Sequence, residues 1–356
     1  MLRLVLLFLF VSALGGCAEI GYYAQAAHGE MSVLSSARPI PDVLDDPQTG
    51  DKLKGRLQKV QQIRAFAVSE LALPDNGSYK SYADLKRAYV LWNVIATPEL
   101  SLKARQWCFP VAGCVSYRGY YSEADAKAFA EELQHEGDDV MIGGVPAYST
   151  LGWFNDPVLS TFIDDSDAEL ARMIFHELAH QTVYAQGDSQ FNEAFATSVE
   201  EAGLALWLDR NGDDKLRALY AGREKREADF LALLLATRKK LEADYAGNAS
   251  DDDKRARKAA IFAGLKDDYQ GLKASWGGYA GYDAWFSRPL NNANLALLAT
   301  YHDYVPAFRE LLRQSGSLPK FYDAVRELAK LDIDERHRRL KALIPAVEMP
   351  SPPPAN

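Results

Sequence analysis

Cysteine is scarce in this sequence, with three residues in a chain of 356. Such a chain cannot depend on a dense network of disulfides, and 24 glycines and 16 prolines are too few for a collagen-like or low-complexity protein. Long apolar runs are also missing after the N-terminal segment, because no later stretch reaches the roughly eighteen consecutive apolar residues of a membrane-spanning helix. With 48% apolar residues, the chain has the composition of a globular protein that buries one or two substantial cores.

Positive charge is in deficit. The 40 lysines and arginines are outnumbered by 49 aspartates and glutamates, so the net charge is −9 and the isoelectric point is about 5.3. Binding to nucleic acid requires a concentrated basic surface, which this composition does not supply. The one basic cluster, Lys254–Lys258, directly follows three aspartates. Such a run of mixed charges is typical of a solvated helix surface. We therefore expect no nucleic-acid partner.

The N-terminus has the pattern of an export signal. Arg3 precedes the apolar segment LVLLFLFVSAL, which is too short to cross a bilayer as a permanent helix. The next residues, Leu14-Gly15-Gly16-Cys17, resemble the lipobox of bacterial lipoproteins. That resemblance implies a signal peptide at residues 1–16 and a lipid on Cys17 that tethers the protein to a membrane. The residue after the cysteine is Ala18, and in this resemblance an alanine there favours a periplasm-facing position at the outer membrane. The alternative is an ordinary cleaved signal in which the cysteine occurs by chance.

The other two cysteines, Cys108 and Cys114, bracket the turn sequence FPVAG. The flanking segments, KARQWC and CVSYRGYY, have the residue types of strands, so the two side chains can face each other across a hairpin. Exported proteins fold in an oxidising compartment, where a disulfide is the natural state of such a pair. We therefore predict a disulfide between Cys108 and Cys114; a metal-binding pair or two free thiols are the alternatives.

The periodicity of apolar residues predicts an α+β protein. Residues 17–75 have a helical pattern interrupted by a proline-rich loop. Residues 76–207 combine strand-like segments at 89–96, 114–121 and 140–154 with a helix that starts after Ser122. Residues 208–348 have a helical pattern almost throughout, and the tail at 349–356, MPSPPPAN, cannot continue a helix and is predicted to be disordered. We expect a small mixed β-sheet followed by a mostly helical lobe.

The most informative segment is SDAELARMIFHELAH, residues 166–180. Ser166 and Glu169 form a capping box, and apolar residues follow at helical spacing, which predicts an amphipathic helix that runs to about residue 185. His176 and His180 therefore lie one turn apart on the same side, where two imidazoles can bind one tetrahedral Zn²⁺ ion. Glu177 lies about 100° round the helix from His176, beside such an ion, where a general base is needed. Two histidines and an acid on a helix surface can also be inert.

A zinc site of this kind needs a third protein ligand and an open position for water. Val183 and Gln186 exclude the metzincin pattern, which has glycine and a ligand at these positions. Downstream, a turn at 187–189 precedes a second helix, whose Asn192-Glu193-Ala194 resembles the Asn-Glu motif of the gluzincins, the thermolysin-like metallopeptidases. The resemblance implies a zincin-like fold in which Glu193 is the third zinc ligand beside the two histidines.

The match to the gluzincin pattern has departures. Only twelve residues separate His180 from Glu193, fewer than in thermolysin-like enzymes, so a tight turn must join the two helices. Thr197 stands one turn after Glu193, where thermolysin has an aspartate that supports a histidine ligand, so the surroundings of the ligands must differ. Glu200 and Glu201, about two turns beyond Glu193, are acidic alternatives on the same helix, as a ligand or as surface acids.

More of the chain resembles a family of proteobacterial lipoproteins described as aminopeptidases. The resemblance extends from the lipobox to about residue 330, and the segments that carry it are CFPVAGCVSYRGYY, HELAHQ, FNEAFATSVEE and RPLNNANLALLATYHDYVPAF. It implies a zinc-dependent peptidase that acts on peptide substrates. A non-catalytic envelope lipoprotein with a structural or vestigial zinc site is the alternative, and a hydrolase of non-peptide amides would share the same site.

A peptidase of this group also needs a residue that stabilises the oxyanion and an edge strand that holds the substrate. The candidates for the oxyanion are Tyr279, Tyr282, Tyr301 and His302. We rank Tyr301 first, because it follows a pair of asparagines on a helix that could face the cleft. The segment from Tyr148 to Phe154, just before the metal-binding helix, is predicted to be the edge strand.

Overall fold

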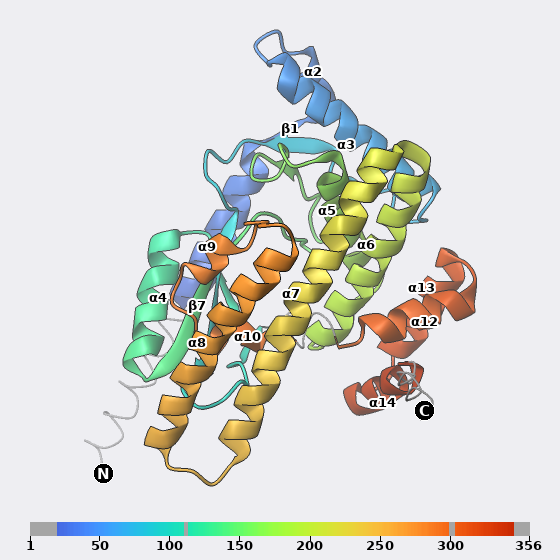
Figure 1. Cartoon of the computed structure of the whole chain (residues 1–356). Helices are drawn as coiled ribbons and strands as arrows, with labels where there is room; N and C mark the ends of the chain where they lie inside the picture. The colour runs from blue at the N-terminus through green and yellow to red at the C-terminus, as the bar shows by residue number, and fades with distance from the viewer. Residues whose placement is uncertain (1–19, 110–112, 299–302, 345–356) are drawn as a thin grey trace, which may run out of the picture.

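A computed structural model of the chain describes residues 20–109, 113–298 and 303–344 (Figure 1). Within these residues the fold is mixed α+β, with three small sheets among a larger number of helices, as the sequence predicts. The predicted signal segment at 1–16, Cys17, Tyr301, His302 and the tail at 349–356 lie outside the described residues. No helix in the described part is long and apolar enough to cross a membrane.

Strands are confined to the first half of the described chain, and helices make up the second half. The first half begins with a helix at residues 20–36 and continues with β1 (Ala37–Pro39), α2 (Ile40–Asp45), α3 (Asp51–Ser69), β2 (Ser81–Ala83), β3 (Leu91–Pro98), β4 (Trp107–Phe109), β5 (Gly113–Val115), β6 (Arg118–Tyr120), α4 (Glu123–His135), β7 (Asp138–Val145) and β8 (Val158–Leu159). The second half comprises α5 (Asp167–His180), α6 (Ser189–Asn211), α7 (Asp214–Ala246), α8 (Asp251–Ser275), α9 (Asp283–Phe286), α10 (Ala293–Ala296), α12 (Val305–Ser315), α13 (Leu318–Ala329) and α14 (Ile333–Leu343).

The sheet that borders the candidate site has the strand order β6-β3-β7, and both neighbours of β3 are antiparallel to it. Side chains of β3 alternate between the two faces of this sheet. Val94 and Ala96 pack with α4, which begins after the predicted cap residue Ser122. Leu91 and Asn93 have the opposite parity and line a cavity. One face of the sheet is therefore filled by a helix, and the other contributes to a cavity.

β4 and β5 form the predicted hairpin. Cys108 and Cys114 are paired in its register and joined by a disulfide, so that prediction is confirmed. The hairpin lies against the turn that follows α5: a Cβ atom on Gly113 would be 2.7 Å from the backbone nitrogen of Gly187. Only glycine at position 113 permits this close approach, which brings the hairpin to the end of α5.

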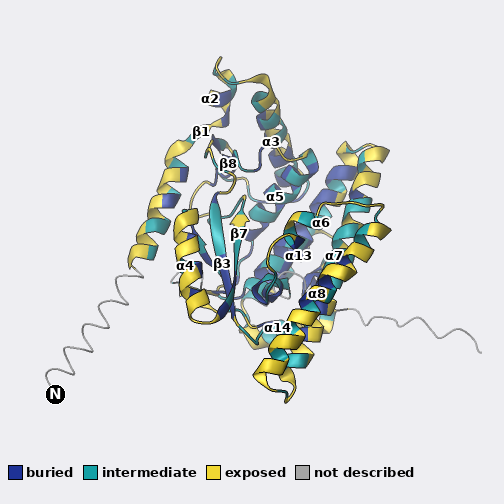
Figure 2. Ribbon diagram, turned by 60° about the vertical axis from the view of Figure 1, so that its left-hand side comes forward, coloured by how far each residue is buried: buried dark blue, intermediate teal, exposed yellow. Residues whose placement is uncertain are grey.

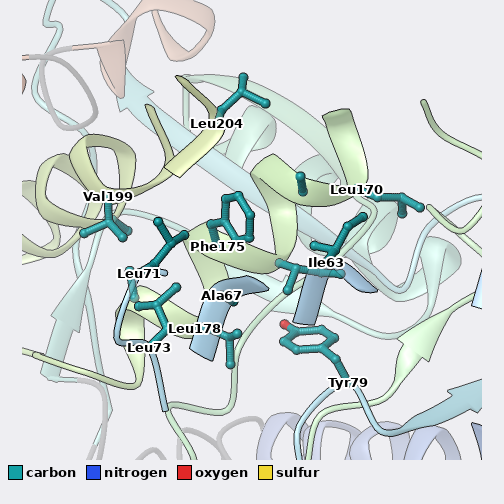
Figure 3. Packing of buried hydrophobic residues seen from close by; sticks show 14 of the residues in the cluster. Ile63, Ala67, Leu71, Leu73, Tyr79, Leu170, Phe175, Leu178, Val199 and Leu204 are labelled. Atoms are coloured by element: carbon teal, nitrogen blue, oxygen red, sulfur yellow. The ribbon is translucent and has the colours of Figure 1, made fainter. Parts of the chain in front are cut away.

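The largest hydrophobic core surrounds α5. Phe175 and Leu178 of this helix are fully buried in one cluster with Ile63 of α3 and Val199 of α6 (Figure 3). α6 approaches α5 closely because Gly203 has no side chain, and a Cβ atom there would lie 2.8 Å from the ring of Phe175. Burial of each large apolar side chain contributes roughly 1.5–3 kcal/mol. The helix that carries the histidine motif is therefore held on several sides by packing.

The helical lobe consists of α7 and α8, which lie side by side in Figure 1, and the shorter helices that follow them. The fully buried Asn292 connects the lobe to the sheet region. Its side-chain amide donates hydrogen bonds to the backbone carbonyls of Glu99 (2.8 Å) and Ser101 (3.1 Å), and its backbone N–H donates to the carboxylate of Asp139 (2.8 Å). A single polar residue thus fastens two parts of the chain that are almost two hundred residues apart in sequence.

The segment at 148–154 is a loop, so the prediction of an edge strand there is wrong. The carboxylate of Asp156 holds the loop by accepting hydrogen bonds from the backbone N–H (3.1 Å) and the hydroxyl (2.6 Å) of Thr150. Leu151 and Gly152 have φ values of 57° and 82°, which strands do not contain. Trp153 is 71% exposed, so the aromatic residues that suggested a strand are not packed in a sheet. The hydrogen bonds to the buried carboxylate of Asp156 therefore outweigh the strand propensity of residues 148–154.

The proline-rich segment near the N-terminus also differs in detail from the prediction. The sequence predicts a loop here, whereas the structure has the short strand β1 and the short helix α2. β1 pairs with β2, a contact across more than forty residues that local composition does not reveal. The predicted strand at 114–121 consists of two strands, β5 and β6, which belong to different sheets.

Candidate metal centre

α5 presents the two histidines of the motif from its last two turns. At its start, Ser166 accepts a hydrogen bond from the backbone N–H of Glu169 (3.3 Å), as the capping box predicts. The helix ends at His180, a few residues before the predicted end. The next residue, Gln181, leaves the helix and its amide nitrogen donates a hydrogen bond to Asp156 (3.1 Å). The C-terminal end of the histidine helix is therefore fastened to the loop that precedes it.

A tight turn brings α6 back beside α5. Asn192 closes it: its Oδ1 accepts a hydrogen bond from the backbone N–H of Ala185 (2.8 Å), and its Nδ2 donates one to the carbonyl of the same residue (2.9 Å). Gly187 has a φ of 77°, which glycine adopts without strain. Asp188 then caps α6. These contacts explain how twelve residues suffice to place Glu193 opposite the histidines.

The structure brings His176, His180 and Glu193 together, with one potential ligand atom of each within 4.8 Å of the others. Nε2 of His176 is 3.2 Å from Nε2 of His180, and Oε2 of Glu193 is 3.4 Å and 3.7 Å from these two nitrogens. Ligand atoms about 2.0–2.2 Å from a tetrahedral Zn²⁺ ion are about 3.3–3.6 Å apart. The donor set and its spacing therefore fit three corners of a zinc site.

Glu200 is buried behind His176 and does not belong to the cluster of three ligands. Its Oε2 lies 2.9 Å from Nδ1 of His176, and its Oε1 accepts a hydrogen bond from Nε of Arg172 (2.5 Å). A carboxylate on Nδ1 fixes the orientation of the ring and keeps Nε2 available for a metal ion. The sequence did not identify this role, because Glu200 lies one turn beyond Thr197, the position that supports a histidine in thermolysin.

Hydrogen bonds between the ligands shift their pKa values. Burial opposes a charge on His176, but hydrogen bonds with Glu193 and Glu200 outweigh it, so the pKa of His176 lies well above its ordinary value. The pKa values of Glu193 and Glu200 lie below their ordinary range despite burial. Both histidines stabilise the negative charge of Glu193, and His176 and Arg172 stabilise that of Glu200. Binding of a divalent cation to such a cluster competes with protons for the same nitrogen and oxygen atoms.

Glu177 lies in the cavity wall beside the three ligands. Burial raises the pKa of Glu177; the charges of the two histidines oppose this shift, and the charge of Glu193 adds to it. Its carboxylate forms no hydrogen bond with another residue in the part of the chain that is described. A carboxylate with unoccupied lone pairs and a raised pKa is suited to accept and return a proton.

The ligand cluster opens into a cavity of about 500 Å³. Its described walls come from β3 and its neighbours β6 and β7, the β4–β5 hairpin and the bend after it, the loop before β8, the α5–α6 region and the helix at residues 20–36. A cavity of this size accommodates a small ligand or the end of a peptide. The described lining contains no lysine and no arginine, and its carboxylates are Glu177 and Glu193.

Two of the tyrosines proposed from sequence, Tyr279 and Tyr282, are not part of the described cavity lining, and Tyr301 lies outside the described residues. Tyr279 and Tyr282 belong to an aromatic cluster of the helical lobe and are not among the lining residues. Other tyrosines do line the cavity, among them Tyr117, Tyr148 and Tyr184. The hydroxyl of Tyr117 forms no hydrogen bond with another described residue, whereas that of Tyr148 is bound to Glu30. No motif identifies Tyr117, because it reaches the site through the bend between β5 and β6.

One comparison with known proteins places this chain in a family. Neither a search of curated proteins nor a search of solved structures finds a significant match. One family model, described as "Putative aminopeptidase", matches residues 21–340, which include the whole histidine cluster and its supporting residues. Because the match covers most of the sequence, the chain belongs to this aminopeptidase family, whose description suggests a peptidase.

Proposed function

We propose that the protein is a zinc-dependent aminopeptidase of the gluzincin type, tethered to the bacterial envelope. The observation that carries the proposal is the spacing of His176, His180 and Glu193, whose ligand atoms are 3.2–3.7 Å apart. The cluster faces a cavity that also contains the carboxylate of Glu177. A purely structural zinc site needs neither a cavity nor a neighbouring base.

The chemistry is hydrolysis of a peptide bond. A Zn²⁺ ion held by the three ligands would supply Lewis acidity, which polarises the scissile carbonyl and acidifies water. Glu177 takes one proton from water while the hydroxyl adds to the carbonyl carbon, and it passes that proton to the nitrogen as the C–N bond breaks. One acid and one amine leave, and Glu177 is again a carboxylate. Burial raises the pKa of Glu177, which makes its carboxylate a stronger base for the first of these transfers.

The negative charge that develops on the carbonyl oxygen needs a hydrogen-bond donor. Tyr301 remains the prediction from sequence for this role. Tyr117 is a second candidate, because it lies in the cavity wall and its hydroxyl forms no hydrogen bond within the described part of the chain. Burial and the charge of Glu193 raise the pKa of Tyr117, so the phenol keeps its proton and can donate it in a hydrogen bond. Replacement of each tyrosine by phenylalanine distinguishes the two candidates.

The envelope location rests on the lipobox resemblance at Cys17. The disulfide between Cys108 and Cys114 supports it, because such bonds persist in oxidising compartments. Two acyl chains or more would anchor the protein stably without a spanning helix. Metabolic labelling with a radioactive fatty acid, followed by membrane fractionation, tests the proposal. We expect label in the membrane fraction, and neither label nor membrane association in the Cys17→Ser variant.

The decisive experiment for the enzyme compares Glu177→Gln with the wild type. We expect both proteins to bind one zinc ion per chain and the variant to lose about 10²–10⁴-fold in turnover of aminoacyl substrates. Glu131→Gln, a substitution of the same type at an exposed position of α4, serves as the matched control. Unchanged turnover in a zinc-loaded Glu177→Gln protein would refute the mechanism. Zinc binding with no turnover of any peptide would favour a structural or vestigial site, and turnover of only non-peptide amides would favour a different hydrolase.

A further inference from the structure

The helix at residues 20–36 forms one wall of the metal cavity. Tyr22 and Ala26 of this helix are among the lining residues. In Figure 2 the helix runs along the left-hand side of the molecule, from the grey N-terminal trace to β1, and lies beside the sheet. Tyr22 stacks on Phe109 of the disulfide hairpin, with ring centroids 5.5 Å apart. The helix and the hairpin therefore close the same side of the cavity together.

Gln25 of this helix occupies the free edge of β6. Its Nε2 donates a hydrogen bond to the carbonyl of Gly119 (3.4 Å), and its Oε1 accepts one from the backbone N–H of Tyr121 (3.1 Å). A carbonyl and an N–H two residues apart on one strand edge are the pair that an added peptide strand would engage. The other edge of β6 pairs with β3. The carboxamide of Gln25 thus takes the place that an extended substrate would take on β6.

A second group of contacts fastens the helix to the cavity wall. The hydroxyls of Tyr121 and Tyr148 both donate to the carboxylate of Glu30, the first at 2.7 Å. The helix approaches closely at Gly29, where a Cβ atom would lie 2.1 Å from the ring of Tyr121. Tyr121 lines the metal cavity on one side and a separate cavity of about 370 Å³ on the other, to which Gln25 also belongs. The contact between helix and Tyr121 therefore separates two cavities.

The charges at this closed side indicate which end of a peptide it would accept. The described lining has no lysine or arginine that could bind a C-terminal carboxylate. Of the carboxylates in the lining, Glu193 is the proposed metal ligand and Glu177 the proposed base, so the negative charge nearest this side is Glu30, which lies directly behind Tyr148. A buried ammonium group gains from nearby negative charge, whereas a buried carboxylate would lack a partner.

We propose that the helix at residues 20–36 restricts the substrate to peptides whose free amino end lies in the metal cavity, and that Gln25 and Glu30 are the positioning residues that hold this wall in place. A chain blocked at its amino end would have to continue through the position occupied by Gln25 and Tyr121. The inference rests on the proposed peptidase function, but it concerns a separate part of the molecule, because neither Gln25 nor Glu30 belongs to the ligand cluster or acts as the base.

The experiment uses the full chain and three forms of one apolar peptide: with a free amino end, with an acetylated amino end, and extended by several residues at that end. The variants are Gln25→Ala combined with Glu30→Gln, and Gly29→Ala, which forces the helix away from Tyr121. Gln62→Ala on the exposed side of α3 is the control for the loss of a glutamine. Three quantities are measured: kcat and KM for each peptide, calorimetric affinity for each peptide, and hydrogen exchange at the backbone N–H of Tyr121.

We expect the wild type and Gln62→Ala to prefer the free amino end by at least about tenfold in affinity and in kcat/KM. In the helix variants we expect faster exchange at Tyr121, an equal or greater affinity for the acetylated and extended peptides, and cleavage of both. A wild type that does not discriminate between the peptides overturns the inference. The inference is also overturned if the Tyr121 amide of the helix variants exchanges faster but these variants still prefer the free amino end. It is likewise overturned if exchange at Tyr121 is unchanged in the variants.

If the protein is not a peptidase, the same experiment gives a different result. A wild type that hydrolyses none of the three peptides contradicts the peptidase assignment, whereas the calorimetric affinities still decide the inference. Preference for the free amino end in binding, lost in the helix variants, would support the role of the helix even then. Equal affinities for all three peptides would refute it.

Discussion

Glu200→Gln should weaken the binding of zinc without removing a ligand. In the structure, Glu200 lies between Nδ1 of His176 (2.9 Å) and the guanidinium of Arg172 (2.5 Å), and its side chain is buried. Glutamine has the same size, and its carbonyl oxygen can still accept a hydrogen bond from one partner. The change removes a negative charge from the environment of His176 and leaves Arg172 with only its partly exposed partners, Glu169 and Glu227.

The magnitude follows from these contacts. Loss of a partner that orients a ligand and raises its basicity typically costs about 10- to 100-fold in metal affinity. That range corresponds to about 1.4–2.7 kcal/mol of binding free energy. The metal-free protein should also lose stability, because a buried arginine without its main partner costs up to about 3–5 kcal/mol. Partial exposure of Arg172 reduces this second figure.

The assay is a competition between the protein and a chelator of known zinc affinity, combined with urea unfolding of the metal-free protein. Glu201→Gln is a matched control, because Glu201 is the next residue on α6 and its ion pair with Arg309 is at the surface. Surface pairs of this kind contribute about 0–1 kcal/mol. We expect the zinc affinity of Glu201→Gln to equal that of the wild type. Equal affinities in wild type and Glu200→Gln would refute the orienting role of Glu200.

Three further predictions concern stability and are checked by urea unfolding. Burial raises the pKa of Asp156 to about 6. Between about pH 4 and pH 6 the folded protein therefore keeps a proton on Asp156 that the unfolded chain has lost. The free energy of unfolding consequently falls as the pH rises through this range. Asp156→Asn should remove up to about 3 kcal/mol of this pH dependence, and identical pH profiles would contradict the assignment. Gly203→Ala should destabilise the fold by about 1–3 kcal/mol through the clash with Phe175, and a neutral effect would show that α6 can move away. Reduction of the disulfide, or Cys108→Ser with Cys114→Ser, should cost roughly 2 kcal/mol, and no change would mean that the hairpin is equally restricted without the bond.

Local sequence signals predicted those features that depend on neighbouring residues. The capping box at Ser166, the helix that carries both histidines, and the hairpin with its disulfide all occur as expected. Each depends on side chains within a few positions, where helical and strand periodicity determine which residues meet. The same reasoning failed at residues 148–154, because Asp156 and Gln181 shape that loop through contacts that local composition does not encode.

The supporting residues of the site depend on the tertiary fold. Glu200 meets His176 only because α6 returns beside α5, and that return depends on Asn192 and on the missing side chain of Gly203. Tyr117 reaches the cavity from a bend between strands of two different sheets. A single sequence contains no spacing rule for such pairs, because their separation in sequence is not related to the geometry of one helix or strand.

The sequence by itself determined which residues make up the candidate centre: two histidines one turn apart, a glutamate between them, and an Asn-Glu pair on the next helix. These residues are close in sequence, so the regular geometry of the helix and one short turn was enough to relate them. Only the tertiary structure decided what surrounds the centre, from the carboxylate behind His176 to the helix at residues 20–36 that lines the cavity. Those contacts join segments that are far apart in sequence, and packing of the whole chain is what brings them together.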